Sequence, residues 1–301
     1  MKRIGLVAGC FVFFLASHLA AQNTHFLIVA GLGGEPDYEQ RFNSYVNDLD
    51  KICKILAGDP SRVATLTGKN VTRETIKAAL DKLAQTAGAN DALAVFLVGH
   101  GSFDGVSYKF NISGPDVTGE DLKAWLDHFP SGRQLVVVAT SSSGVCADQL
   151  ARDNRVVVTA TKTGTERNAT VFARYWVEAL RDPAADTDKN ETISALEAFH
   201  YAEEKVKRFF SDQKRLATEH PRLEGKLAGS FVLARLGNAA LAANDPARRK
   251  LLAQRETLEQ QIDALKFRKS ALPSDQYKRE LERLLLELAK VQDAIESGSG
   301  K

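Results

Sequence analysis

Short apolar runs and stretches of helical spacing alternate along most of the chain. Four runs are rich in Val, Leu, Ile and Phe and are too short for typical helices, which indicates strands buried on both faces of a sheet. They are His25–Gly31, Ala92–Val98, Gln134–Thr140 and Arg155–Thr161. A shorter strand is expected at Arg62–Leu66.

Between these strands, apolar residues recur three or four positions apart, which is the spacing of an amphipathic helix. The expected helices are Tyr38–Ala57, a segment opened by Thr72, Gly119–Phe129, Thr170–Leu180 and about Ile193–Phe210. Strands that alternate with helices predict a mostly parallel sheet covered on both faces. The expected fold class is therefore α/β, a three-layer sandwich over residues 22–237.

A different pattern begins at Asn238, where Ala, Lys, Arg, Glu, Gln and Leu dominate. Asp245-Pro246 is a favourable helix start. A heptad-like stripe follows, made of Tyr277, Leu281, Leu284, Leu288, Val291 and Ile295. Because Pro273 interrupts the pattern, we expect an antiparallel helical hairpin over residues 244–297. Its leucines are expected to bury against each other or the α/β domain, or else to form an arm that binds a protein partner.

The first 21 residues have the features of a secretory signal peptide. Lys2-Arg3 precedes the apolar stretch Ile4–Leu15, and Leu19-Ala20-Ala21 offers a small-residue cleavage site. We therefore expect an exported protein, periplasmic or secreted, without a membrane span after cleavage. Lipidation at Cys10 is an alternative, although this residue lies early in the apolar stretch.

The composition narrows the function classes. Apolar residues make up 44% of the chain, charged residues 26%, and the net charge is only +2, so no basic excess suggests nucleic acid. After signal cleavage only Cys53 and Cys146 remain, which excludes a disulfide-dense scaffold. Whether these two cysteines form a disulfide stays open.

Two of the expected strands end in breaks that carry chemistry. Ala92–Val98 runs into Gly99-His100-Gly101-Ser102, and Gln134–Thr140 ends at Ser141-Ser142-Ser143-Gly144. Open α/β sheets place their sites at the carboxyl ends of strands. If the two strands are neighbours, His100 and the serine cluster face each other across one cleft.

This combination of a strand with His-Gly-Ser and a second strand ending near Ser-Gly resembles the legumain-like and caspase-like cysteine peptidases, over roughly Phe26 to Leu236. The resemblance implies a caspase-like fold, a peptide or protein substrate, His100 as general base, and the N–H of Gly101 as an oxyanion donor. The family's nucleophilic Cys, in an Ala-Cys-x-Ser-Gly context, is replaced here. If the Ser-Gly of this pattern is aligned with Ser143-Gly144, Ser141 occupies the cysteine position. If its Ala is aligned with Ala139, Thr140 occupies that position.

Two hypotheses follow from this replacement. The first is a hydrolase in which His100 activates Ser141. The second is a catalytically inactive homologue that binds peptides through the cleft or partners through the hairpin. A serine hydroxyl needs a tightly aligned base, whereas a thiol forms its thiolate beside a histidine. Cys146 is an alternative nucleophile outside the strand-end position, and Glu166 is a candidate contact to a basic or polar substrate side chain.

A second constellation matches the ligand spacing of a calcium-binding loop. Asp186, Asp188, Asn190, Thr192, Ser194 and Glu197 occupy positions one, three, five, seven, nine and twelve. The predicted cofactor is calcium. Two residues argue against calcium binding. Glu191 occupies position six, which is usually glycine because φ is positive there. Pro183 prevents a helix from running straight into the loop. The alternative is an acidic helix N-terminus that favours the helix dipole.

Overall fold

The computed structural model describes residues 23–242 and 245–297. The expected signal peptide lies outside these residues. A six-stranded sheet forms the centre of the molecule, in the order β10-β8-β7-β3-β1-β2. The strands are β1 (Thr24–Ala30), β2 (Val63–Leu66), β3 (Ala92–Val98), β7 (Arg133–Ala139), β8 (Arg155–Thr159) and β10 (Arg222–Glu224). All neighbouring pairs are parallel except β8 and β10, which confirms the expected mostly parallel sheet.

Helices cover both faces of this sheet, because successive side chains of each strand point to opposite sides. In β1, Phe26 and Ile28 join one apolar cluster and Leu27 and Val29 join another. The first cluster includes α1 (Pro36–Ala57), α5 (Phe172–Ala179) and α6 (Ala195–Asp212). The second includes α2 (Arg73–Ala84), α3 (Gly119–His128) and α4 (Val145–Leu150). The three-layer α/β sandwich is therefore confirmed.

Two small sheets complete the domain. β4 (Gly101–Phe103), β5 (Tyr108–Phe110) and β6 (Val117–Thr118) follow the His100 turn, and β9 (Thr192–Ser194) pairs with β11 (Val232–Arg235). The expected helix at Ile193 begins later, at Ala195, because the preceding residues form β9. The shorter turns are 3-10 helices at Pro60–Arg62, Gly68–Asn70, Pro183–Ala185, Ala228–Ser230 and Lys269–Ala271.

The C-terminal part is helical, as expected. After α7 (Gly237–Ala242), two long helices, α8 (Pro246–Phe267) and α9 (Ser274–Ser297), pack against each other. Their shared core contains Leu258, Ile262, Leu265, Leu284, Val291 and Ile295. No helix among the described residues has both the length and the apolar character needed to cross a membrane.

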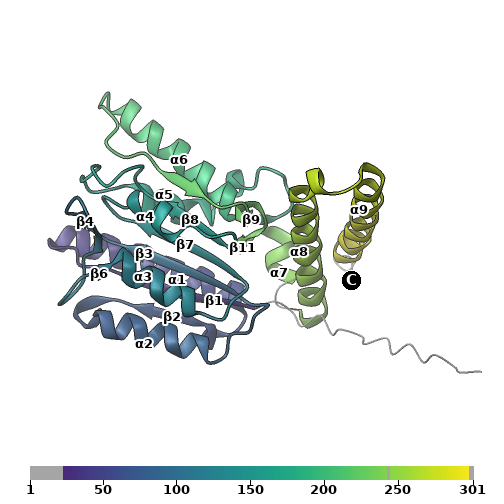
Figure 1. Ribbon diagram of the computed structural model, residues 1–301, viewed down its shortest axis with the longest axis horizontal. Helices are drawn as coiled ribbons and strands as arrows, with labels where there is room; N and C mark the ends of the chain where they lie inside the picture. Colours follow the sequence, from purple (N-terminus) through teal and green to yellow (C-terminus); the bar gives the residue numbers. More distant parts are fainter. Residues whose placement is uncertain (1–22, 243–244, 298–301) are drawn as a thin grey trace, which may run out of the picture.

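The hairpin lies at the amino edge of the central sheet. Arg133 is the first residue of β7 and lies near the carboxylate of Glu256 on α8. Burial lowers the pKa of Arg133 to about 10, and the charge of Glu256 partly offsets this decrease. Glu256 also pairs with Arg235 at the end of β11. Figure 1 shows α8 and α9 on one side of the domain and β4 and β6 at the opposite side. The candidate site and the hairpin are thus at opposite ends of the strands.

Candidate functional site

The His100 and Ser141 turns leave the same edge of one sheet. β3 and β7 are adjacent and parallel, with Val98 aligned to Ala139, and each turn begins within two residues of this aligned pair. Their expected placement as neighbours is correct. The carboxyl edge therefore brings a histidine turn and a serine turn together, where parallel sheets place their sites.

The Ser141 hydroxyl is held by the backbone of Gly101. Its Oγ donates to the Gly101 carbonyl at 2.9 Å and accepts from the Gly101 N–H at 3.2 Å. Ser141 is only 3% exposed. A Cβ at Gly101 would lie 2.6 Å from the Ser141 carbonyl oxygen, so glycine is required for this approach. The N–H that the resemblance assigns to an oxyanion already has the hydroxyl as its acceptor.

The His100 ring is fixed by other neighbours. It makes edge contacts with Tyr38 and Phe42 of α1, at centroid distances of 4.8 and 5.1 Å. Burial lowers the pKa of His100, and a hydrogen bond with the Gly33 backbone partly offsets that effect. The imidazole is therefore neutral at neutral pH. In the described part of the chain, no hydrogen bond joins this ring to the Ser141 hydroxyl.

The residues around Ser141 are also engaged in hydrogen bonds. Thr140, the alternative anchor, is fully buried; its hydroxyl bonds the Ser141 carbonyl and lies 2.7 Å from the Tyr108 hydroxyl. The Ser143 hydroxyl lies 3.2 Å from that of Thr161. Ser142 adopts a positive φ of 55°, which a non-glycine residue rarely does. The hydroxyls of Thr140, Ser141 and Ser143 thus all have partners, whereas the buried Ser142 hydroxyl has none among the described residues.

The loop after β8 supports the serine turn from the other side. The Glu166 carbonyl accepts the Ser142 N–H at 2.8 Å. The Glu166 carboxylate lies 2.9 Å from Nδ1 of His220 and accepts the Lys162 N–H. Glu166 therefore orders the serine turn and the segment before β10.

Glu219, next to His220, is a buried carboxylate. It is 3% exposed and accepts the N–H groups of Val171 and Phe172 at the start of α5, each at 2.8 Å. Burial raises its pKa to about 7, against the effect of those two hydrogen bonds, and the charge of Glu166 adds to the rise. This side chain links the segment before β10 to α5.

Neither cysteine supplies an exposed thiol to the candidate site, although the Cys146 N–H donates to the Ser143 carbonyl of the serine turn. Cys53 belongs to the apolar cluster on one face of the sheet and Cys146 to the cluster on the other, and both are free thiols. Burial raises the pKa of both thiols well above the usual range. Cys146 is therefore a packing residue without thiolate character, and the two cysteines do not form a disulfide in this structure.

The structure brings the acidic residues of the predicted calcium loop together. Carboxylate oxygens of Asp186, Asp188 and Glu197 lie within 4.8 Å of one another. Glu191, at position six, has a φ of +61°, the conformation that the pattern requires. The Pro183–Ala185 turn precedes the loop in place of an incoming helix, as Pro183 led us to expect.

Internal hydrogen bonds already hold this loop. The Asp186 carboxylate accepts the N–H groups of Asn190 and Glu191 at 3.1 Å. Glu197 forms a capping box with Ser194 at the start of α6 and also accepts from Thr187. These contacts fit the helix-start interpretation as well as a metal loop.

The loop also contacts the hairpin. Nη1 of Arg255, a residue of α8 that is 3% exposed, donates to the Asn190 carbonyl at 3.0 Å. The Glu191 carboxylate accepts the Ala239 N–H of α7 at 2.8 Å. The acidic loop therefore lies where the α/β domain meets the C-terminal helices.

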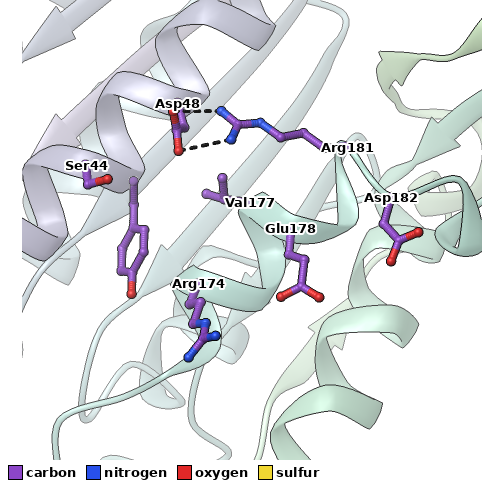
Figure 2. Close-up of a pocket in the computed structure, with 8 residues that line it drawn as sticks. Ser44, Asp48, Arg174, Val177, Glu178, Arg181 and Asp182 are labelled. Atoms are coloured by element: carbon purple, nitrogen blue, oxygen red, sulfur yellow. Dashed lines mark hydrogen bonds and ion pairs between the residues drawn. The ribbon is translucent and has the colours of Figure 1, made fainter.

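A separate hollow of about 330 Å³ lies between α1 and α5, away from the candidate site. Figure 2 shows Arg181 reaching across to the Asp48 carboxylate, while Arg174 and Glu178 extend from α5. The Glu178 carboxylate pairs with Lys205 and Tyr201. The residues that line this hollow include neither His100 nor Ser141, and several of its charged side chains form ion pairs.

Sequence reasoning missed several residues of the site. Tyr38 and Phe42 flank His100, although the helical spacing indicated only that Phe42 faces inward. The partnership of Glu166 and His220 spans 54 positions, and no local pattern signals it. Thr161 ends the expected strand Arg155–Thr161, but no local pattern predicts that its hydroxyl lies beside that of Ser143.

The chain was compared with known proteins. No family model matches it, and the curated proteins give no match. Among solved structures, caspase-1 from Spodoptera frugiperda has 15% identity and a TM-score of 0.49; the match covers 71% of this chain and 90% of the caspase. A protein from Geobacter sulfurreducens has 12% identity and a TM-score of 0.47, over 71% of this chain and 100% of the other. Both likenesses concern overall architecture alone.

Proposed function

We propose that this protein is a relative of the caspase-like and legumain-like peptidases that binds a peptide or protein segment at the sheet edge of His100 and Ser141 without hydrolysing it. One observation carries the proposal: the Ser141 hydroxyl bonds both backbone groups of Gly101 and is buried. A nucleophile needs a base within hydrogen-bond reach and free N–H donors for the oxyanion. Ser141 has Gly101 as its partner where a hydrolase would use His100.

The hydrolase hypothesis keeps one supporting observation. Burial lowers the pKa of His100, so its imidazole is neutral and able to accept a proton at neutral pH. For catalysis, Ser141 would have to leave Gly101 and turn toward that ring. A typical hydrogen bond contributes on the order of 1 kcal/mol, so the two bonds to Gly101 oppose this rotation by about 2 kcal/mol.

A mixed peptide library tests the two hypotheses together. We expect the wild-type protein to retain peptides and to leave them intact, as read by mass spectrometry. The loop of Leu32 lies beside the site, because the backbone of the next residue, Gly33, bonds His100, and Leu32 is 39% exposed. We therefore expect Leu32→Glu to weaken binding at least tenfold. The matched control is Ile55→Glu, at a residue of α1 that is 67% exposed, and it should bind as the wild type does.

Peptide cleavage that disappears in His100→Ala would establish the hydrolase instead. Absence of both binding and cleavage would refute both hypotheses. Circular dichroism of each variant separates loss of binding from loss of the fold.

We further propose that the loop from Asp186 to Glu197 binds calcium. Its support is the convergence of three carboxylates within 4.8 Å in a stretch with the ligand spacing of a calcium loop. Burial raises the pKa of Asp188, and the nearby charges of Glu197 and Asp186 add to this. A divalent cation would relieve that repulsion. The side-chain oxygen of Asn190, the Thr192 carbonyl and a water held by Ser194 would complete the oxygen ligands.

Thermal unfolding in about 10 mM calcium and then in excess chelator tests this site, because extracellular modules bind calcium at roughly 0.1–1 mM. We expect the midpoint to rise by several degrees with calcium. Glu197→Gln keeps the capping box while removing the charge, so it should abolish the rise. Glu203→Gln, on the same helix, is the control. An unchanged wild-type midpoint would remove the proposal.

We also propose that the protein is exported, on the evidence of the sequence features of residues 1–21 alone. Cell fractionation should find the protein outside the cytoplasm, and sequencing its amino terminus should give Gln22. A cytoplasmic protein that retains Met1 would contradict this.

A further inference from the structure

Helix α9 carries apolar residues on the side that faces away from α8. Leu284, Val291 and Ile295 are buried against α8. Leu285 and Leu286, in contrast, are 47% and 57% exposed. Figure 1 shows α8 between α9 and the α/β domain, so the outer face of α9 points away from the rest of the chain.

The exposed residues of this face form a continuous line, because residues three and four apart lie on one side of a helix. We call this line the outer stripe; it consists of Lys278, Glu282, Leu285, Leu286, Ala289 and Asp293, all exposed. The two leucines form its centre, with Lys278 on one side and Asp293 on the other, and exposed Asp275 continues the line beyond Lys278.

The outer stripe is self-complementary when two copies run antiparallel. Leu285 and Leu286 are the two central residues of α9, which has 24 residues. Lys278 lies seven positions before Leu285, and Asp293 lies seven positions after Leu286. A two-fold axis between the leucines therefore sets Lys278 of each copy opposite Asp293 of the other.

The next positions inward are also compatible. Glu282 lies three positions before Leu285, and Ala289 lies three positions after Leu286. The Glu282 carboxylate of one copy would therefore face the small side chain of Ala289 in the other copy, next to Lys290. A parallel arrangement would instead place Lys278 opposite Lys278 and Asp293 opposite Asp293. Like charges oppose such pairing, so the charge pattern selects the antiparallel arrangement.

We propose that the outer stripe is the interface of a homodimer in which two copies of α9 pack antiparallel around Leu285 and Leu286. The two hairpins together form a four-helix bundle, and the dimer has the closed two-fold symmetry most common among oligomers. The helices overlap over about 36 Å at 1.5 Å per residue. Because only two leucines of each copy lie at the centre, we expect micromolar affinity.

Sedimentation equilibrium of the full chain between about 1 and 100 µM tests the dimer. Wild-type protein should shift from monomer to dimer over this range. Leu286→Glu should leave it monomeric throughout, whereas Ile55→Glu, on the exposed side of α1, should dimerise normally. The thermal midpoint of each variant shows whether it is folded.

The register has its own test. Lys278→Glu and Asp293→Lys should each weaken dimerisation at least tenfold, because each change creates two like-charge contacts per dimer. The double variant restores opposite charges across the axis and should recover the wild-type affinity. A protein that is monomeric at 100 µM, a dimer insensitive to Leu286→Glu, or a double variant that fails to recover would overturn the proposal.

Discussion

At the scale of single residues, the candidate site is governed by the contact between Gly101 and Ser141. The resemblance to peptidases assigns one of these residues to the oxyanion and the other to the nucleophile position. In the structure they bond each other instead. The Ser141 hydroxyl is a strong hydrogen-bonding group, and the Gly101 backbone supplies both a donor and an acceptor for it.

Gly101→Ala tests how close this contact is. The new Cβ would lie 2.6 Å from the Ser141 carbonyl oxygen and 2.7 Å from the Thr140 hydroxyl. We expect a loss of about 1–3 kcal/mol in the free energy of unfolding, the usual cost of overpacking, read from urea denaturation. Gly88→Ala is the control, because its Cβ would have 3.8 Å to the nearest atom. Equal midpoints for the two variants would contradict the geometry.

Glu219 predicts how stability depends on pH. Burial raises its pKa from 4.5 to about 7 in the folded protein, so ionisation is harder there than in the unfolded chain. Its contribution to stability is therefore complete below pH 4.5 and is lost as the pH rises toward 7. The full loss is about 3 kcal/mol.

Glu219→Gln should remove this pH dependence, although its single side-chain oxygen keeps only one of the two hydrogen bonds from Val171 and Phe172 and so lowers stability at every pH. Urea denaturation at pH 5 and pH 8 measures it. Glu204→Gln, at an exposed position paired with Arg208, should keep the wild-type slope. Identical pH profiles for wild type and Glu219→Gln would show that the carboxylate is ionised at little cost.

At the scale of elements, the long strands, the helices and the short strand β2 were predictable, whereas β9, β10 and β11 were not. Each long strand is an apolar run buried on both faces, so composition alone indicates it. β9, β10 and β11 have three or four residues each and depend on partners far along the chain. Their formation is decided by tertiary packing, which local periodicity does not encode.

The contact between α8 and the acidic loop can be tested at Arg255. Arg255 of α8 is buried and donates to the Asn190 carbonyl, so Arg255→Gln removes a charged donor from that carbonyl. We expect a cost of about 1–3 kcal/mol. Amide hydrogen exchange should become faster in α8 and in the acidic loop, and stay unchanged in β3.

Arg283→Gln is the matched control, because Arg283 lies on α9 with an exposed partner, Glu287. It should leave exchange in α8 as it is in the wild type. Unchanged protection of α8 in Arg255→Gln would mean that other contacts hold the hairpin.

At the scale of the whole molecule, two regions lie toward opposite ends of the parallel sheet. The His100 and Ser141 turns lie at its carboxyl edge, and the hairpin with the acidic loop lies toward the other end (Figure 1). The sequence was sufficient to place each turn at the carboxyl end of a strand, but only the structure shows that these two strands are neighbours. The sequence was also not sufficient to show that Ser141 bonds Gly101, because that depends on how β4 leaves the turn to pair with β5.

A serine-reactive fluorophosphonate probe, followed by peptide mapping, tests the central claim most directly. Because the Ser141 hydroxyl is buried and bonded to Gly101, we predict that native protein is not labelled at Ser141. Labelling of Ser141 in the native wild-type protein, lost in His100→Ala, would show that the histidine activates this hydroxyl and would contradict a binding cleft without hydrolysis.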